Sequence, residues 1–291
     1  MNNRDFLLNP FVKKFYNYIN KINDSLKREL ELYSWSEFFL PLKYACDGGK
    51  RIRPLILTLC AESLNNGNLD SLNSRAIENI YTVSTAIELL HTESVIHDDI
   101  IDSDNIRRGV PSFHVKYGYN ASILTADFIL GIILNIGAKI SNNSVSKELS
   151  NAVLKMSEGE MMELRLVKNH HISQNDYIKV IENKTASLFE ASAKIGAILG
   201  SGNDKEINAL ANYGKLLGIA YQIHDDLIDY NNEERLFNIF VKQNDEDNKC
   251  VEIMEHTYLN YSDLARKELE SINNNNSKKV LEELTNLESI T

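Results

Sequence analysis

The scarcity of proline is the feature that most constrains how this chain can fold. Its 291 residues contain four prolines, the last of them Pro111, so about 180 consecutive residues carry none. A sandwich or barrel needs many turns, where proline and glycine are common, and this stretch argues against both. Apolar residues recur every three or four positions from Ile77 to Val95 and from Ala209 to Ile223. This spacing is typical of amphipathic helices, and no strand-like alternation persists anywhere.

Clusters of glycine, asparagine and serine, one of them with proline, mark the expected breaks between helices. They fall at 47–49, 65–68, 109–111, 141–144, 169–175, 200–204 and 273–277. We therefore predict an all-α fold in which residues 1–291 form a single domain, a bundle of about ten or more helices.

Composition excludes several classes of partner and location. The formal charge of −10 would repel nucleic acid and anionic lipid, so no nucleic-acid partner is expected. The three cysteines show no metal-binding or redox spacing. The N-terminus lacks the form of a signal peptide, and the most apolar stretch, near 128–136, is too short to span a membrane. We expect a cytoplasmic protein with no integral membrane segment.

Two aspartate clusters carry the strongest chemical signal. Both have acids at positions i, i+1 and i+4, and they comprise Asp98, Asp99 and Asp102, and Asp225, Asp226 and Asp229. On a helix, positions i and i+4 lie on one face, where apolar neighbours worsen the repulsion between the charges. Mg²⁺ would relieve this repulsion, because it completes its octahedron with water and phosphate oxygens. A solvated acidic face explains one such cluster well, but two of identical spacing poorly.

Two basic segments accompany the clusters. Arg107 and Arg108 follow the first cluster, where its helix is expected to end, and adjacent guanidinium groups can bind two different phosphates. Lys50 and Arg53 follow a glycine pair at 48–49. Either segment alone is typical of a charged surface. Beside the carboxylates, both indicate a site for phosphate groups.

The order of these motifs resembles that of the trans-isoprenyl diphosphate synthases, all-helical enzymes that make farnesyl, geranylgeranyl and longer prenyl diphosphates. The resemblance covers roughly residues 40–230. It is carried by the blocks GKRIRP (49–54), HTESVIHDDIID (91–102), RRG (107–109), KTA (184–186) and QIHDD (222–226), in the family's order. It implies an isoprenoid synthase-like bundle around a central cavity, and a homodimer, with a heteromer as the alternative.

The resemblance also implies roles for the matching residues. The predicted metal set is Asp98, Asp102 and Asp225, supported by Asp99, Asp226 and Asp229, on about three Mg²⁺ ions in the closed complex. Arg107 and Lys184 would bind the allylic diphosphate, and Lys50, Arg53, His91 and Arg108 would bind isopentenyl diphosphate. Thr185 and Gln222 would face the allylic cation, which makes them, with Lys184, the predicted catalytic residues.

The reaction implied by the resemblance is an ionisation followed by a condensation. Metal ions and basic residues would stabilise the leaving diphosphate while an allylic cation forms. The isopentenyl double bond would then attack the cation, and the departing diphosphate would accept the released proton. No protein nucleophile is required.

The sequence departs from the family after the second cluster. Relatives continue there with a Gly-Lys, Gly-x-Asp, Gly-Lys stretch, whereas this chain reads DYNNEERLFNIFVK from Asp229 to Lys242 and has no glycine after Gly218. We predict a shortened C-terminal region after about residue 230, in which Lys242 and Arg235 are candidate replacements for the missing lysine. A segment near 251–272 resembles the family's closing helix.

Product length and two rival functions stay open. In the family a bulky aromatic at Glu93 or Ser94 would stop the growing chain, and neither residue is aromatic, which favours geranylgeranyl or longer products. A non-catalytic or regulatory subunit of a heteromeric synthase is one rival: the missing loop favours it and the intact aspartates oppose it. A terpene cyclase is less favoured, because the chain has a second full aspartate cluster and the basic segment at Lys50.

Overall fold

The structure, a computed structural model, describes residues 10–140, 142–169, 172–230, 235–243 and 247–289. The chain comprises two compact units, one within residues 1–58 and 72–146 and the other within 59–71 and 147–291. Helices dominate both units, so the predicted all-α class is confirmed. Part of the predicted break at 169–175 and part of the shortened connection after Tyr230 fall on 170–171 and 231–234, outside the described residues.

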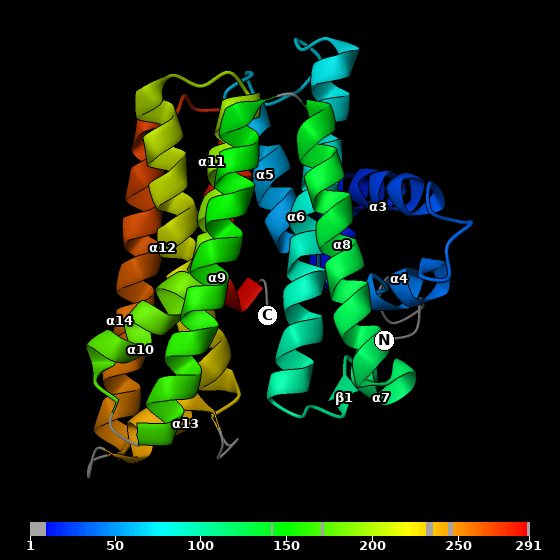
Figure 1. Ribbon diagram of the computed structural model, residues 1–291. Helices are drawn as coiled ribbons and strands as arrows, with labels where there is room; N and C mark the ends of the chain where they lie inside the picture. The colour runs from blue at the N-terminus through cyan, green and yellow to red at the C-terminus, as the bar shows by residue number, and fades with distance from the viewer. Residues whose placement is uncertain (1–9, 141, 170–171, 231–234, 244–246, 290–291) are drawn as a thin grey trace. The chain divides into compact units, whose positions relative to one another are not determined.

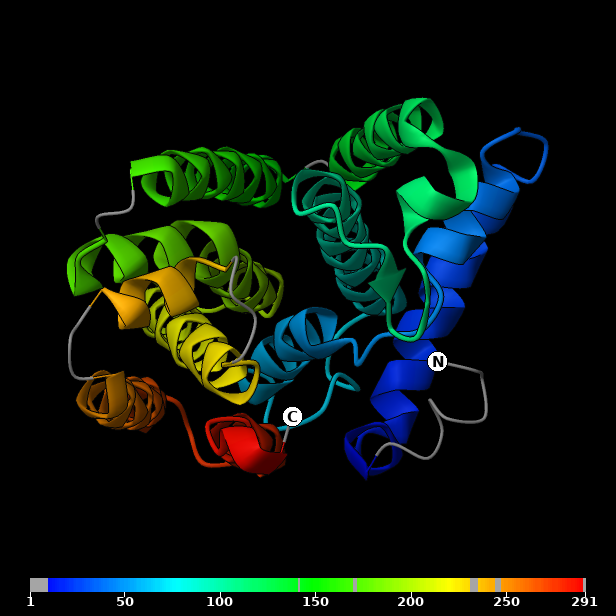
Figure 2. The same ribbon diagram turned by 90° about the horizontal axis from the view of Figure 1, so that it is seen from below.

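The first unit is built around one long helix. Its elements are α2 (Pro10–Lys14), α3 (Tyr16–Glu31), α4 (Phe39–Ala45), the first turns of α5 (Ile52–Ser63), α6 (Ser74–Ile101), α7 (Phe113–Tyr117) and α8 (Tyr119–Ile140). α6 packs against both α3 and α8, as Figures 1 and 2 show. Asn73 caps α6 by accepting a hydrogen bond from the N–H of Ala76. The middle of α6 is buried nearly all round, as expected of a central helix.

A short hairpin that was not predicted from the sequence follows α6. β1 (Ile106–Arg107) pairs antiparallel with β2 (Val110–Pro111). Arg108 (φ 53°) and Gly109 (φ 75°) form its turn, and positive φ at both central residues suits a tight hairpin. α6 itself ends at Ile101, so Arg107 and Arg108 lie in this hairpin and not at a helix end as we expected.

The second unit is built around α12 (Asp204–Ile228), which packs against both α11 and α14 (Figures 1 and 2). Its other elements are α9 (Asn143–Asn169), whose first turn belongs to the first unit, α10 (Gln174–Ile181), the π-helix η1 (Glu182–Ala186), α11 (Ser187–Leu199), α13 (Leu236–Lys242), α14 (Asp247–Glu268), η2 (Leu269–Ser271), α15 (Asn276–Glu283) and η3 (Leu287–Ser289). The helix predicted near 251–272 is therefore present as α14 and η2.

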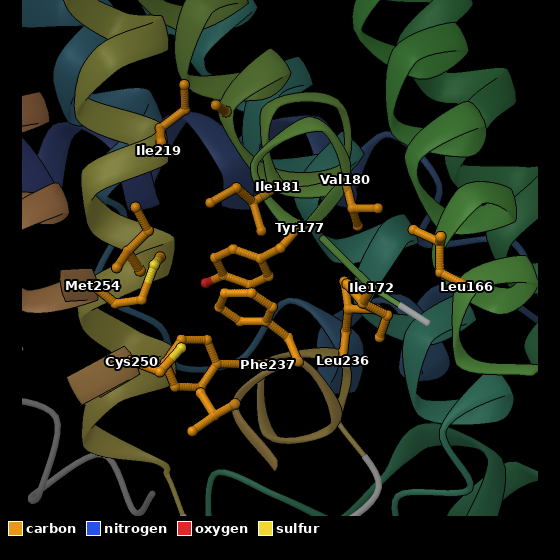
Figure 3. Close-up of a cluster of buried hydrophobic side chains, with 14 residues drawn as sticks. Leu166, Ile172, Tyr177, Val180, Ile181, Ile219, Leu236, Phe237, Cys250 and Met254 are labelled. Carbon is orange, nitrogen blue, oxygen red and sulfur yellow. The ribbon is translucent and has the colours of Figure 1, made fainter. Parts of the chain in front are cut away.

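A buried apolar cluster joins α10, α12, α13 and α14 in the second unit (Figure 3). Tyr177 of α10 lies at its centre, with its ring close to those of Phe237 and Phe240 of α13. Burial of such rings supplies much of the stability of a core. The cluster therefore fixes the short helix α13 against the helix that carries the second aspartate cluster.

Candidate functional site

The first aspartate cluster occupies the last turn of α6. The N–H of Asp102 donates to the carbonyl of Asp98 at 2.8 Å, so helical geometry continues through both residues and they share a face, as predicted. Asp99 points elsewhere: it is 2% exposed and accepts a hydrogen bond from Nε of Arg107 at 2.7 Å. Burial raises the pKa of Asp99, and the charge of Arg107 opposes that rise. Asp99 therefore holds Arg107 beside the stacked pair, and Asp104 contacts the same guanidinium at 3.2 Å.

The basic residues predicted to bind isopentenyl diphosphate gather in the first unit. Nη1 of Arg53 lies 3.5 Å from Nε2 of His91, and Arg108 donates to the carbonyl of Asp47 at 3.1 Å. Gly49, at φ 93°, lets the loop that carries Lys50 approach Arg108, because a Cβ there would lie 3.0 Å from Nη2. Burial, and then the charges of Arg53 and Arg108, lower the pKa of His91 well below its usual value. The lowered pKa favours the neutral imidazole, and in the tautomer protonated at Nδ1 its Nε2 can accept from Arg53.

Arg51 supports this basic loop through buried hydrogen bonds, a role that was not predicted from the sequence. Its side chain is buried and donates to Glu88 at 2.5 Å, to Oδ1 of Asn23 at 2.9 Å and to the carbonyl of Cys46 at 2.7 Å. Its backbone, at φ 56°, begins the turn into α5. The sequence feature that could have indicated this role is Glu88, a carboxylate within the most apolar part of α6. A buried acid requires a partner, which a basic residue of the loop could have supplied.

Lys184 lies in η1, in the second unit, between two acids of α9. Its Nζ is 2.5 Å from Glu160 and 2.8 Å from Glu163. Lys184 therefore meets a carboxylate of α9 on each side, and its charge is compensated within the protein.

Thr185, Gln222 and Asp226 form one hydrogen-bonded chain that ends at Tyr177. Thr185 donates to Oε1 of Gln222 at 2.8 Å, and Nε2 of Gln222 donates to Oδ1 of Asp226 at 2.8 Å. The hydroxyl of Tyr177 donates to Oδ2 of Asp226 at 2.6 Å. Burial raises the pKa of Asp226 to about 7, although both hydrogen bonds oppose the rise. Both oxygens of Asp226 thus accept hydrogen bonds from protein side chains. Tyr177 was not among the residues predicted for the site.

The second aspartate cluster occupies the end of α12 and resembles the first. The N–H of Asp229 donates to the carbonyl of Asp225 at 3.0 Å, so this pair also shares a face. Nη1 of Arg235 lies 3.7 Å from Oδ2 of Asp229. One of the two candidate replacements for the family's missing lysine therefore lies beside the cluster.

The aspartate pairs fit a cation that takes most of its ligands from elsewhere. Among the described residues, no three His, Cys, Asp or Glu side chains are grouped closely enough to hold a metal ion by themselves. Each cluster instead offers two carboxylates one helical turn apart, Asp98 with Asp102 and Asp225 with Asp229. Mg²⁺ is commonly bound by one or two carboxylates and completes its shell with water and substrate phosphates.

One described helix, α8, is long and apolar enough to cross a membrane, and 44% of its most apolar stretch is buried. The most apolar stretch expected from the sequence, near 128–136, is shorter than this helix of 22 residues. The buried face of α8 packs on α6 and α7 within the first unit. A core helix has the same length and composition, so α8 is weak evidence for a membrane span.

Comparison with known proteins gives a consistent result. Residues 36–287 match the family model described as polyprenyl synthetase. The geranylgeranyl diphosphate synthase of Methanosarcina mazei is 34% identical over 229 residues, which cover 77% of this chain and 68% of that protein. The octaprenyl diphosphate synthase of Escherichia coli is 37% identical over 185 residues, covering 63% and 54%.

Solved structures share the fold. A geranylgeranyl pyrophosphate synthetase from Pyrococcus horikoshii Ot3 matches with a TM-score of 0.82 and 23% identity, over 95% of this chain and 97% of that chain. A decaprenyl diphosphate synthase from Rhodobacter capsulatus matches with a TM-score of 0.79 and 24% identity, over 96% and 98%.

Proposed function

This chain belongs to the polyprenyl synthetase family and is a prenyltransferase, and we propose that it condenses isopentenyl diphosphate with an allylic diphosphate to make a product of geranylgeranyl length or longer. One observation carries the proposal: the two aspartates of each pair lie one helical turn apart, and basic residues gather around His91 in the first unit. Carboxylates for Mg²⁺ and guanidinium groups for phosphate are the groups that diphosphate chemistry needs.

The proposed mechanism divides the work among the residues of the chain. In each unit the aspartate pair, Asp98 with Asp102 and Asp225 with Asp229, would hold Mg²⁺, which would neutralise charge on a leaving diphosphate. Arg107 in the first unit and Lys184 in the second are the proposed hydrogen-bond donors to phosphate, and Lys184 must exchange at least one of its carboxylate partners to bind a phosphate. These donors stabilise charge that develops as the C–O bond breaks.

The second substrate is held by the basic loop. Lys50, Arg53, His91 and Arg108 bind isopentenyl diphosphate and direct its double bond at the allylic carbon. The carbonyl oxygen of Gln222 and the hydroxyl of Thr185 face the cation and stabilise it electrostatically. A carbon–carbon bond then forms, and the released proton passes to the departed diphosphate.

Steady-state turnover of the purified chain tests this function. With Mg²⁺, isopentenyl diphosphate and an allylic primer, we expect a longer prenyl diphosphate by mass spectrometry, and we expect a chelator to abolish its formation. Calorimetric binding of the primer without condensation, for every primer tried, would instead support a non-catalytic subunit. A cyclic hydrocarbon formed without isopentenyl diphosphate would indicate a terpene cyclase.

Product length depends on the residues one turn before the first cluster. The carboxylate of Glu93 lies 3.2 Å from Nδ1 of His97, so its charge has a partner on the same helix. Ser94 is small and half-buried, with its hydroxyl donating to the carbonyl of His91 at 2.9 Å. A hydrocarbon tail that passes Ser94 therefore meets no bulky ring there.

Replacement of Ser94 with phenylalanine is expected to shorten the product. The added ring would occupy the space that the tail needs, and product analysis by mass spectrometry would detect the change. Ser94→Ala is the matched control and should keep the wild-type chain length. An unchanged distribution for Ser94→Phe would show that the tail does not run past this position.

We further propose that the protein is a cytoplasmic homodimer. The exposed face of α8 carries Ile123, Leu124 and Leu134, each more than half exposed. Apolar side chains that lie together on one exposed helix face are typical of an interface between subunits. A heteromer remains the alternative.

A further inference from the structure

We propose that Tyr177, held by the aromatic side chains of α13, is a positioning residue that fixes Asp226 and through it the amide of Gln222. The inference rests on the proposed function, because Gln222 is assigned there to the allylic cation. It gives Asp226 and the short helix α13 a defined part in that reaction. Tyr177 itself touches no substrate in this proposal.

The hydrogen bonds determine which way the amide of Gln222 faces. Asp226 accepts through both oxygens, one bond from Tyr177 at 2.6 Å and one from Gln222 at 2.8 Å. Nε2 of Gln222 is the donor to Asp226, so the NH₂ group of the amide faces that carboxyl group. The carbonyl oxygen of Gln222 therefore faces Thr185, whose hydroxyl donates to it at 2.8 Å. A flipped amide would place its oxygen against the carboxylate.

Tyr177 anchors this series of hydrogen bonds because its ring is held by tight packing. The residue is 1% exposed, and its ring stacks on Phe240 at 5.6 Å with an interplanar angle of 4°. The ring of Phe237 lies 5.4 Å away on the same side of the cluster. Figure 3 shows the Tyr177 hydroxyl on the side of its ring that faces α12. A rigid donor holds a carboxylate at lower entropic cost than a flexible one.

The support for Tyr177 comes from one short helix. Phe237 and Phe240 both belong to α13, which follows the second aspartate cluster. The aromatic contacts of α13 with Tyr177 thus connect the shortened C-terminal region to Asp226 and Gln222. A purely structural tyrosine would fill the same space without affecting the amide.

Tyr213 supplies a matched control. It is also fully buried, and its hydroxyl also donates a hydrogen bond, to the carbonyl of Leu281 at 2.8 Å. It lies on α12, far along the helix from Gln222, and its partner is in α15. Tyr177→Phe and Tyr213→Phe remove the same atom from similarly buried sites.

The test compares steady-state kinetics of the two variants. We expect Tyr177→Phe to lower kcat about 10- to 100-fold, because Gln222 loses its fixed orientation, with the KM for isopentenyl diphosphate changed less than about twofold. Tyr213→Phe should keep the wild-type kcat, even if it lowers the melting temperature as much as Tyr177→Phe does. Equal kcat values for both variants, or a rise in KM without a fall in kcat, would overturn the inference.

A double-mutant cycle provides the second readout. If Tyr177 acts through Asp226, then Tyr177→Phe should add nothing to the kcat defect of Asp226→Asn. Independent, multiplicative defects would contradict the proposal. Should Tyr177→Phe fail to fold, Phe240→Leu removes the stacked ring instead and should also lower kcat. An unchanged kcat for Phe240→Leu would contradict the proposal as well. An inactive wild-type protein would defeat the proposed function itself, which separates the two failures.

Discussion

Replacement of Arg51 with methionine is expected to lower the free energy of unfolding by about 3–5 kcal/mol and to weaken the binding of isopentenyl diphosphate. Arg51 is 6% exposed and Glu88 2% exposed, so the substitution leaves a buried carboxylate without its partner. It also removes the donor to Asn23 and to the carbonyl of Cys46, which fix the loop before α5. Lys50 and Arg53 lie on either side of Arg51 and would lose their defined positions.

Urea denaturation and calorimetry with isopentenyl diphosphate measure the two effects. Lys194→Met is the control, since Lys194 and Glu148 form a more exposed pair, 3.0 Å apart, at 29% and 14% side-chain exposure. Its cost should stay below about 1 kcal/mol, with affinity unchanged.

A double variant, Arg51→Met with Glu88→Leu, separates stability from positioning. An apolar pair of similar volume can replace a buried ion pair with little loss of stability. We therefore expect stability to recover while the affinity for isopentenyl diphosphate stays low, because the bonds to Asn23 and Cys46 are still missing. Recovery of both would show that Arg51 has no role beyond stability.

Replacement of Gly159 with alanine is expected to reduce turnover about 100-fold and to destabilise the protein by about 1–3 kcal/mol. A Cβ at Gly159 would lie 2.5 Å from the backbone nitrogen of Lys184 and 2.9 Å from its Cα. Backbone atoms cannot rotate away as a flexible side chain can, so η1 must move. η1 carries both Lys184 and Thr185, and a displacement of about 1 Å is enough to disturb a catalytic arrangement.

Gly131→Ala is the matched control for this change. Gly131 also lies inside a helix, α8, but a Cβ there would meet nothing within 4 Å. The substitution should keep turnover and raise stability by up to about 1 kcal/mol, because alanine favours helix more than glycine does. Wild-type kinetics for Gly159→Ala would show that η1 accommodates the methyl group without moving its side chains.

Several features of the site were accessible from the sequence because they are local. The stacking of Asp98 with Asp102 and of Asp225 with Asp229 follows from the helical repeat alone. The helix spacing around Ile80 and Ala220 predicted α6 and α12 in the same way. The hairpin at 106–111 was missed, because its only local sign is the arginine–glycine pair at its turn.

The residues that support the site depend on contacts between distant parts of the chain. Glu88 is 37 residues from Arg51, and Asp226 is 49 residues from Tyr177. The sequence contained Arg51 within a recognised motif, but nothing local shows that its side chain is buried. Tyr177 is likewise one aromatic residue in an amphipathic helix.

Helical periodicity and motif spacing act over a few residues, so the helical class and the places of the aspartates and the basic loop were predictable from the amino-acid order. The pairing of the charges was not: Arg51 pairs with Glu88, Arg107 with Asp99, and Lys184 with Glu160 and Glu163. The hydrogen bonds that Asp226 accepts from Tyr177 and Gln222 likewise became visible only in the folded chain. A buried polar group takes whatever partner packing brings within hydrogen-bond distance, and packing joins helices that lie far apart along the chain.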